Sequence, residues 1–274
     1  MLKRPGGINI TLTLLILSVL MFSLAVMAQT HPAALPLRAR QLIGMKVEDS
    51  DGQKAGTIRN LVLNMNTGNL RYVVIGSGGY FGVHATLKLA PVQVMSPATV
   101  KRQTLAIHVS TPHWRDAPVF KYRDLAAIAE PGGATEISRY FQISANKPAP
   151  EAERLPKTGR DVSTIRKPAD LKFASDLIGM RVVNQKQEKI GEVLDLLVSF
   201  GEPHPAFVIV SSGRLFHQDY QYAVRLNVLS RSNNKLILDA DTAALQQAPL
   251  FDQTAWESRT NSSPQVYHYL TPTD

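Results

Sequence analysis

Ser212, His217 and Asp219 are the three residue types that nucleophilic catalysis needs, a hydroxyl, a base and an orienting acid, and they fall within eight residues. A catalytic triad is defined by hydrogen-bond geometry rather than by closeness in sequence, and no glycine-flanked nucleophile elbow surrounds Ser212. The segment belongs to a repeat, and the other copy does not hold the same set. We therefore predict no catalytic residue, and a protein that is not an enzyme.

Residues 76–82 read GSGGYFG and have the composition of a phosphate-binding loop. A dinucleotide or P-loop site also needs a helix directly after the glycines, and a P-loop needs Gly-Lys-Ser/Thr. Here residues 84–89 lead into another predicted strand, so the run is interpreted as a hairpin with an aromatic tip. We predict no cofactor-binding residue and no cofactor.

Metal sites also lack support in the sequence. The seven histidines include no His-x-x-x-His pair, and none lies beside a carboxylate cluster, whereas zinc needs three or four converging ligands. The run from Asp49 to Gly52 starts like a calcium loop, but Asn60 stands at the twelfth position, where such loops carry an acid. We predict a turn there and no metal site.

The elements that carry these residues occur twice. LIGMKV from Leu42 and LIGMRV from Leu177 begin two segments that align without a gap as far as Gly78 and Gly213. A second anchor closes each copy, APVF at 117–120 and APLF at 248–251. A unit of this length is a duplicated domain rather than a solenoid repeat, whose period is about 20–50 residues.

Each copy has the pattern of short strands. β-branched and aromatic runs such as RYVVI at 71–75 and AFVIV at 206–210 alternate with turn signals every few residues. Gly56 and Gly191 fall at equivalent places, as expected for the kinks that curve a small sheet. The prediction is an all-β fold of two small β-barrels joined by a long linker, with short helical turns.

The chain divides into five predicted regions. Residues 1–28 have a basic start, an apolar stretch and a small-residue exit, and predict a signal peptide cleaved after Ala28. The alternative is a membrane anchor formed by residues 8–26. The first domain spans 38–120, a partly disordered linker spans 121–173, the second domain spans 174–251 and a tail spans 252–274. The expected location is the periplasm or the outside of the cell.

The charge is uneven. The chain has a net charge of +8, and residues 38–120 hold ten Lys/Arg against four Asp/Glu, whereas residues 174–251 hold seven against eight. A basic surface suits an anionic ligand or a membrane surface, or it serves solubility alone. Because export is expected, nucleic acid is not a predicted partner.

Large apolar side chains are predicted at two equivalent hairpin tips. Tyr80 and Phe81 correspond to Leu215 and Phe216 when the gapless alignment of the two copies is continued. Apolar residues on a turn either dock a partner or fold over the open end of a barrel and plug it. These four residues are the candidate interaction sites, and both alternatives stay open.

The repeat resembles the PRC-barrel domain family. The resemblance is carried by Leu-Ile-Gly-Met-x-Val, the glycine before the next strand, the hairpin of the GGYF type and the closing Ala-Pro-x-Phe. The second copy is the closer match, whereas Asn60 in the first copy stands where family members often carry an acid. The resemblance implies a small β-barrel used for binding or assembly, and we expect a protein-interaction module acting on an unknown partner in the cell envelope. The alternative is that the basic first domain binds an anionic small molecule, lipid or polymer.

Overall fold

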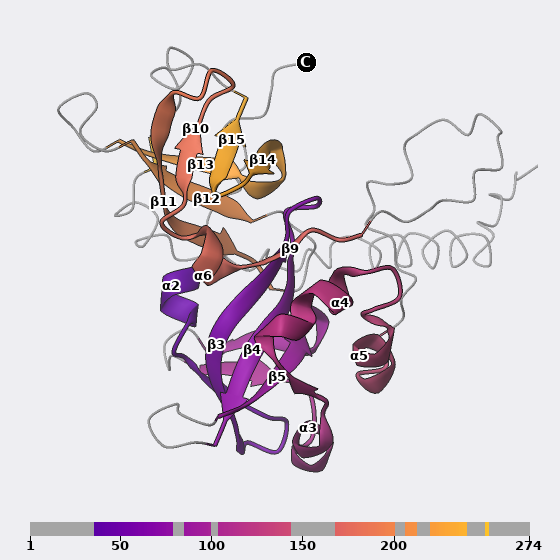
Figure 1. Ribbon diagram of the computed structural model, residues 1–274. Coiled ribbons are helices and arrows are strands. Elements are labelled where there is room, and N and C mark those ends of the chain that lie inside the picture. The colour runs from indigo at the N-terminus through magenta and orange to yellow at the C-terminus, as the bar shows by residue number, and fades with distance from the viewer. Residues whose placement is uncertain are drawn as a thin grey trace, which may run out of the picture. The chain divides into compact units, whose positions relative to one another are not determined.

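The computed structural model of this chain describes residues 36–78, 85–99, 104–143, 168–200, 206–212, 220–239 and 250–251 (Figure 1). The signal segment with its exit at Ala28 and the tail 252–274 lie outside these residues. Within the part that is described, no helix has the length and apolar character needed to cross a membrane.

Strands dominate both copies, which confirms the all-β prediction, and the helices are short. The first copy and the segment after it contain β1 (Leu37–Arg38), α2 (Ala39–Leu42), β2 (Lys46–Glu48), β3 (Lys54–Asn64), β4 (Leu70–Ser77), β5 (Thr86–Pro91), η1 (Val92–Val94), β6 (Met95–Thr99), β7 (Thr104–Ile107), α3 (Thr111–Asp116), β8 (Val119–Phe120), η3 (Tyr122–Asp124), α4 (Leu125–Ala129) and α5 (Thr135–Tyr140). The second contains β9 (Leu171–Phe173), α6 (Ala174–Leu177), β10 (Arg181–Val183), β11 (Lys189–Val198), β12 (Phe207–Ser211), β13 (Gln221–Arg225), η6 (Leu226–Val228), β14 (Leu229–Ser232) and β15 (Lys235–Leu238).

The two copies have the same strand topology. The first sheet has the order β6-β7-β2-β3-β4-β5-β8, and the second has the order β13-β12-β11-β10-β15-β14. In each sheet, an antiparallel meander is extended by one parallel pair of strands. This pair is β2 with β7 in the first sheet and β10 with β15 in the second. The two sheets have equivalent strand orders, so the predicted duplication is also a duplication of structure.

Gly56 and Gly191 allow the sheets to curl tightly. A Cβ atom on Gly191 would lie 2.2 Å from the backbone oxygen of Ser211, and one on Gly56 would lie 2.6 Å from the backbone oxygen of Gly76. No real side chain fits at such distances, so the neighbouring strand crosses each glycine at a closeness that only glycine permits. The interpretation of these glycines as structural agrees with this geometry.

Each sheet also contains a strand from the other copy. The strand β1, which precedes the first copy, pairs with β11 of the second sheet, and β9, which precedes the second copy, pairs with β3 of the first. The register is identical in the two exchanges. Leu37 lies opposite Val198, and Lys172 lies opposite Leu63, which are equivalent pairs of positions in the two copies.

The exchanged strands bring a buried helical turn with them. Leu42 in α2 and Leu177 in α6 are fully buried, as are Ala39 and Ala174 one turn before them. Full burial of a leucine side chain is worth about 1.5–3 kcal/mol. These residues belong to one continuous apolar cluster that includes core residues of both copies, so the hydrophobic effect holds the exchange together.

Exchange also explains why β3 and β11 are apolar without alternation. Leu61, Val62 and Leu63 are consecutive and fully buried, and so are Leu196, Leu197 and Val198. Successive strand residues point to opposite faces, so these strands are covered on both faces.

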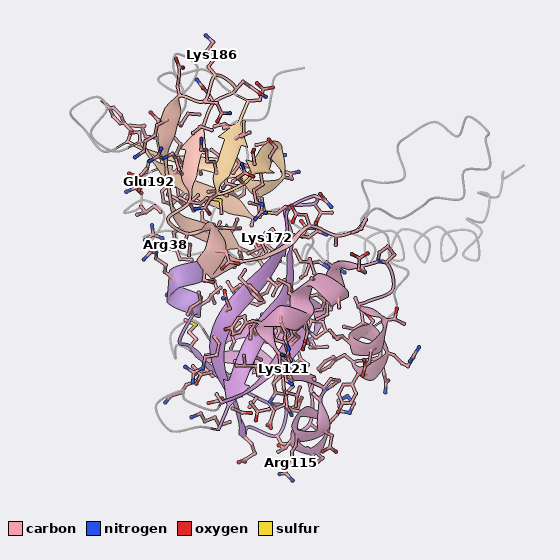
Figure 2. All side chains as sticks on the ribbon, viewed as in Figure 1. Arg38, Arg115, Lys121, Lys172, Lys186 and Glu192 are labelled. Atoms are coloured by element: carbon pink, nitrogen blue, oxygen red, sulfur yellow. The ribbon has the colours of Figure 1, made fainter. Side chains whose placement is uncertain are left out.

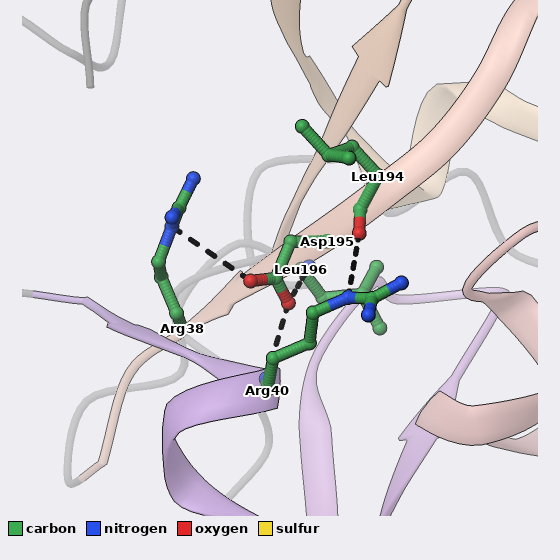
Figure 3. A network of polar contacts seen from close by, with 5 residues as sticks. All are labelled: Arg38, Arg40, Leu194, Asp195 and Leu196. Carbon is green, nitrogen blue, oxygen red and sulfur yellow. Dashed lines mark hydrogen bonds and ion pairs between the residues drawn. The ribbon is translucent and has the colours of Figure 1, made fainter.

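Figure 3 shows the polar contacts that accompany the exchange at Asp195 on β11. Its Oδ1 atom accepts hydrogen bonds from the backbone N–H groups of Leu196, at 2.8 Å, and Arg40, at 3.2 Å. Its Oδ2 atom lies 3.7 Å from Nε of Arg38. Nε of Arg40 donates to the backbone oxygen of Leu194 at 2.9 Å. The side chain of Asp195 is almost completely buried, so β1 and α2 supply the partners that its charge needs.

Asn60 provides the equivalent hydrogen-bond acceptor in the first sheet, and it carries no charge. Its Oδ1 accepts from the N–H groups of Leu61, at 2.9 Å, and Ser175, at 3.3 Å, and its Nδ2 donates to the Ser175 hydroxyl at 2.8 Å. Leu61 and Ser175 are the equivalents of Leu196 and Arg40. The acid that the resemblance led us to expect at position 60 is replaced by an amide with the same acceptor geometry.

The segment expected to be a linker contributes ordered structure at both ends. Residues 121–173 include η3, α4 and α5, whose Leu125 and Ile137 are buried in the common core, and they include the exchanged strand β9. Residues 144–167 lie outside the described part of the chain.

We predict that the acceptor oxygen of Asp195, more than its charge, stabilises the fold. Asp195→Leu leaves two buried N–H groups without an acceptor, and should lower the free energy of unfolding by about 3 kcal/mol. Asp195→Asn keeps an acceptor, as Asn60 does, and should lower it by about 1 kcal/mol or less. Urea unfolding of the two variants measures the difference. Equal losses in both variants would show that the ion pair with Arg38 dominates.

Candidate functional site

In the sequence, the predicted interaction residues fall between the two strands of two equivalent hairpins. The hairpin β4–β5 closes on the pair Ser77 and Thr86, and in β12–β13 the N–H of Ser212 donates to the oxygen of Tyr220 at 2.8 Å. The loops beyond these pairs therefore differ by one residue in length. The tips themselves, with Tyr80, Phe81, Leu215 and Phe216, lie outside the described residues, and their role stays a prediction.

Of the residues Ser212, His217 and Asp219, which were weighed for catalysis, the structure describes Ser212. Ser212 is buried at the base of the second hairpin, and His217 and Asp219 lie outside the described residues.

Asp49 is used in a turn, where its carboxylate accepts from the N–H groups of Asp51 and Gln53 and from the Thr111 hydroxyl. Within the described ranges, no group of three or more candidate metal ligands occurs.

The closing Ala-Pro-x-Phe element places an exposed apolar side chain beside a buried phenylalanine. In the first copy, Phe120 is buried opposite Leu87 on β5, while Val119 is 62% exposed. In the second copy, the N–H of Phe251 donates to Gln221 on β13, and Leu250 is 49% exposed. In the sequence this element marks the end of each repeat, and its third residue is also a surface feature that both barrels present.

A buried lysine fastens α3 to the first sheet. Nζ of Lys88 on β5 donates to the backbone oxygens of Trp114, at 2.7 Å, and Arg115. The same ammonium group lies 5.5 Å from the centre of the Trp114 ring. The indole N–H of Trp114 in turn donates to the oxygen of Ala55 on β3 at 2.9 Å. Burial lowers the pKa of Lys88, and the nearby carboxylate of Asp116 opposes this effect.

Helix α5 is held against α3 by aromatic contacts. The rings of His113 and Tyr140 stack with centres 4.4 Å apart, and the Tyr140 hydroxyl donates to the backbone oxygen of His113. Phe141 lies edge-on to His113 and tilted against Trp114. A cavity of about 300 Å³ remains between α4, α5 and the edge of the sheet at β5 and β8.

Part of the positive charge of the first copy is used inside the molecule. Arg38 and Arg40 contact the second sheet at Asp195 and Leu194, and Lys88 is buried against α3. Other cations of the first copy remain exposed, among them Arg115 (Figure 2). The surface of the first copy is therefore less basic than its composition indicates.

Comparison with known families gives two matches to the same description, PRC-barrel domain, at residues 37–109 and 169–245. The first matched range begins with the exchanged strand β1, and the second includes the whole of β9. No curated protein matches the chain. The matched unit therefore extends beyond the curled sheet and includes the strand that pairs with the other copy.

Replacing Lys88 by methionine should show how much the contact between Lys88 and α3 contributes to the free energy of unfolding. Lys88→Met leaves two buried carbonyl oxygens without their donor, and the free energy of unfolding should fall by about 1–3 kcal/mol. Because burial lowers the pKa of Lys88, the folded protein releases this proton at a lower pH than the unfolded chain, so the wild type gains stability as pH rises.

The difference in unfolding free energy between the wild type and Lys88→Met should therefore widen as pH approaches the ordinary lysine value of 10.5 from below. Denaturant unfolding at several pH values measures it. A difference that narrows with rising pH would mean that the charged amine is favoured in the folded state.

Proposed function

The chain belongs to the PRC-barrel family, and from this membership we propose that it is a non-enzymatic interaction and assembly module of the cell envelope. The family match covers more than half of the chain and is confined to the two barrels. Function is carried by surfaces grafted on a fold rather than by the fold itself, so the proposal depends on what the two barrels present to a partner.

The observation that carries the proposal is that the equivalent hairpins β4–β5 and β12–β13 belong to sheets that have exchanged strands. A partner with two matching sites gains avidity when the distance between the hairpins suits both. A flexible linker would leave that distance free. The exchange of β1 and β9 restricts it, because each sheet is hydrogen-bonded to the other copy, and restriction before binding lowers the entropy lost on binding.

The exposed apolar residues of the closing elements support the same proposal. Val119 and Leu250 occupy equivalent positions, and each is largely exposed beside a buried phenylalanine. Apolar side chains that are exposed in the same way in both copies suit a partner that contacts both barrels. They form a second pair of candidate contacts besides the hairpin tips.

The envelope location rests on the N-terminal segment 1–28 of the sequence. Export with cleavage after Ala28 places the mature chain in the periplasm or outside the cell, whereas retention of residues 8–26 leaves it anchored to a membrane. The N-terminal residue of protein purified from the native host decides between them, with Gln29 expected after cleavage.

Binding of an anionic ligand by the first barrel is the alternative function. Its support is weaker, because two of the ten cations in residues 38–120 are used inside the molecule, Arg38 beside Asp195 and the buried Lys88 against α3. Binding of this kind must weaken steeply with salt, as the Debye length falls from about 10 Å at 0.1 M to about 3 Å at 1 M.

We predict that the hairpin tips are required for partner capture and not for stability. Phe81→Ala with Phe216→Ala should abolish the recovery of crosslinked partner from the native envelope fraction and leave the melting temperature within about 2 °C of the wild type. The control for the tip variant is Val119→Ala with Leu250→Ala, which removes the second pair of candidate contacts from the same barrels and leaves the tips unchanged.

Capture kept by the tip variant and lost by the control would move the docking surface to the closing elements. A large loss of stability in the tip variant with unchanged capture would show that the tips plug the barrels. Either result would overturn the assignment of Tyr80, Phe81, Leu215 and Phe216 as the docking surface.

A further inference from the structure

The cavity beside the first barrel has apolar walls from several elements. Leu89 on β5 and Phe120 on β8 form the side of the sheet, Ile128 on α4 and Ile137 on α5 form the opposite side, and Phe141 follows α5. Its volume of about 300 Å³ is at the lower end of the range for ligand pockets, about 300–1,000 Å³. The space is partly open to solvent, and its size suits a small molecule rather than a protein segment.

The walls are fixed by contacts outside the cavity. A Cβ on Gly133 would lie 1.9 Å from the backbone oxygen of Ala127, so only glycine permits the close turn from α4 to α5. The stack of Tyr140 on His113 holds the far end of α5 to α3. A ligand would therefore meet a preformed site, with little ordering entropy to lose on binding.

Two carboxylates are the charged residues that line the cavity. Asp124 is oriented by the backbone N–H of Lys121, which donates to its Oδ2 at 2.9 Å, and its Oδ1 lies 4.0 Å from Nε of the exposed Arg123, which partly offsets its charge. Glu136, in the first turn of α5, has no hydrogen-bond or ion-pair partner among the described residues. These acids stand out on a chain whose net charge is +8, and they favour a positively charged ligand group.

The cavity therefore combines apolar walls, two aromatic rings and negative charge at one place. Aromatic faces attract cations as well as apolar groups. An anion would meet Asp124 and Glu136 without a lining cation to offset them, and a neutral apolar molecule would leave both carboxylates unused. The segment that builds the outer wall, residues 122–143, lies outside both family matches, so the cavity is not explained by the barrel fold.

From this arrangement we propose that the cavity binds a small amphiphilic cation, an apolar body that carries a protonated amine. The apolar body lies against Leu89, Phe120 and Ile137, and the amine faces Glu136 and Asp124. This site is separate from the hairpin tips and does not depend on the proposed assembly role.

Three probes of the same shape and different charge test the proposal. These are 4-phenylbutylamine, 4-phenylbutanol and 4-phenylbutyrate, titrated into the full-length chain at pH 7.5 and followed by calorimetry. The amine should bind at least about five-fold more tightly than the alcohol, which corresponds to the upper range of a solvent-exposed ion pair, about 1 kcal/mol. The carboxylate should bind more weakly than the alcohol.

Two variants locate the binding. Ala127→Phe places a large side chain at the wall from an exposed helix position and should weaken the binding of both amine and alcohol at least about ten-fold by filling the space. Glu136→Gln should reduce amine binding about two- to five-fold and leave the alcohol unchanged. Glu130→Gln is the matched control, because Glu130 is a nearby acid that does not line the cavity. It should bind all three probes as the wild type does.

Thermal unfolding of each variant checks that the fold is intact. Amine binding that persists in Ala127→Phe would place the ligand elsewhere and overturn the proposal. Equal affinity for the amine and the carboxylate, or equal effects of Glu136→Gln and Glu130→Gln, would overturn the assignment of a cation.

Discussion

The exchange of β1 and β9 is the constraint on which the rest of this structure depends. Each barrel lacks one strand of its own and receives it from the copy at the other end of the linker. The exchange is made of backbone pairing in one register, a buried helical turn on each side, and one buried acceptor per sheet. The buried turns and the acceptors at Asn60 and Asp195 both stabilise the exchange, and the acceptors determine which backbone groups meet.

The exchange changes how the duplication should be understood. Two copies joined only by a linker would behave as independent domains, and their charges and surfaces would act separately. With exchanged strands, Arg38 and Arg40 belong by sequence to the first copy and by contact to the second. The same register at both sites means that two single-copy chains related by a two-fold axis could form these contacts, so the tandem chain has the local symmetry of a dimer in one polypeptide.

Much of the fold could be predicted from the sequence, because it depends on local patterns. The β-branched runs, the turns between them and the glycines at 56 and 191 predict a small curled sheet in each copy, and the gapless alignment of the copies predicts that the sheets match. The exchange could not be predicted in this way. Its strands are two and three residues long, too short for a hydrophobic period, and a strand of that length is decided by its partner rather than by its own residues.

The candidate sites were likewise only partly predictable from the sequence. Lys88 lies between leucines in a strand and is expected to face water by alternation, yet α3 covers it and the backbone oxygens of that helix receive the amine. The cavity is formed by helices of five and six residues, below the length at which sequence periodicity is informative. One signal was present, because Pro131, Gly132 and Gly133 between two short apolar stretches indicate a tight turn between helices.

Cleavage of the linker tests the exchange most directly. A protease site placed between Leu155 and Pro156, outside the described residues, allows the folded chain to be cut into two fragments that each hold one curled sheet and one strand of the other. The exchange predicts that the cut protein elutes as a single one-to-one complex in size-exclusion chromatography and separates only in denaturant. Two fragments that separate at once under native conditions, each with folded β-structure, would show that each barrel is complete without the other and would contradict the account.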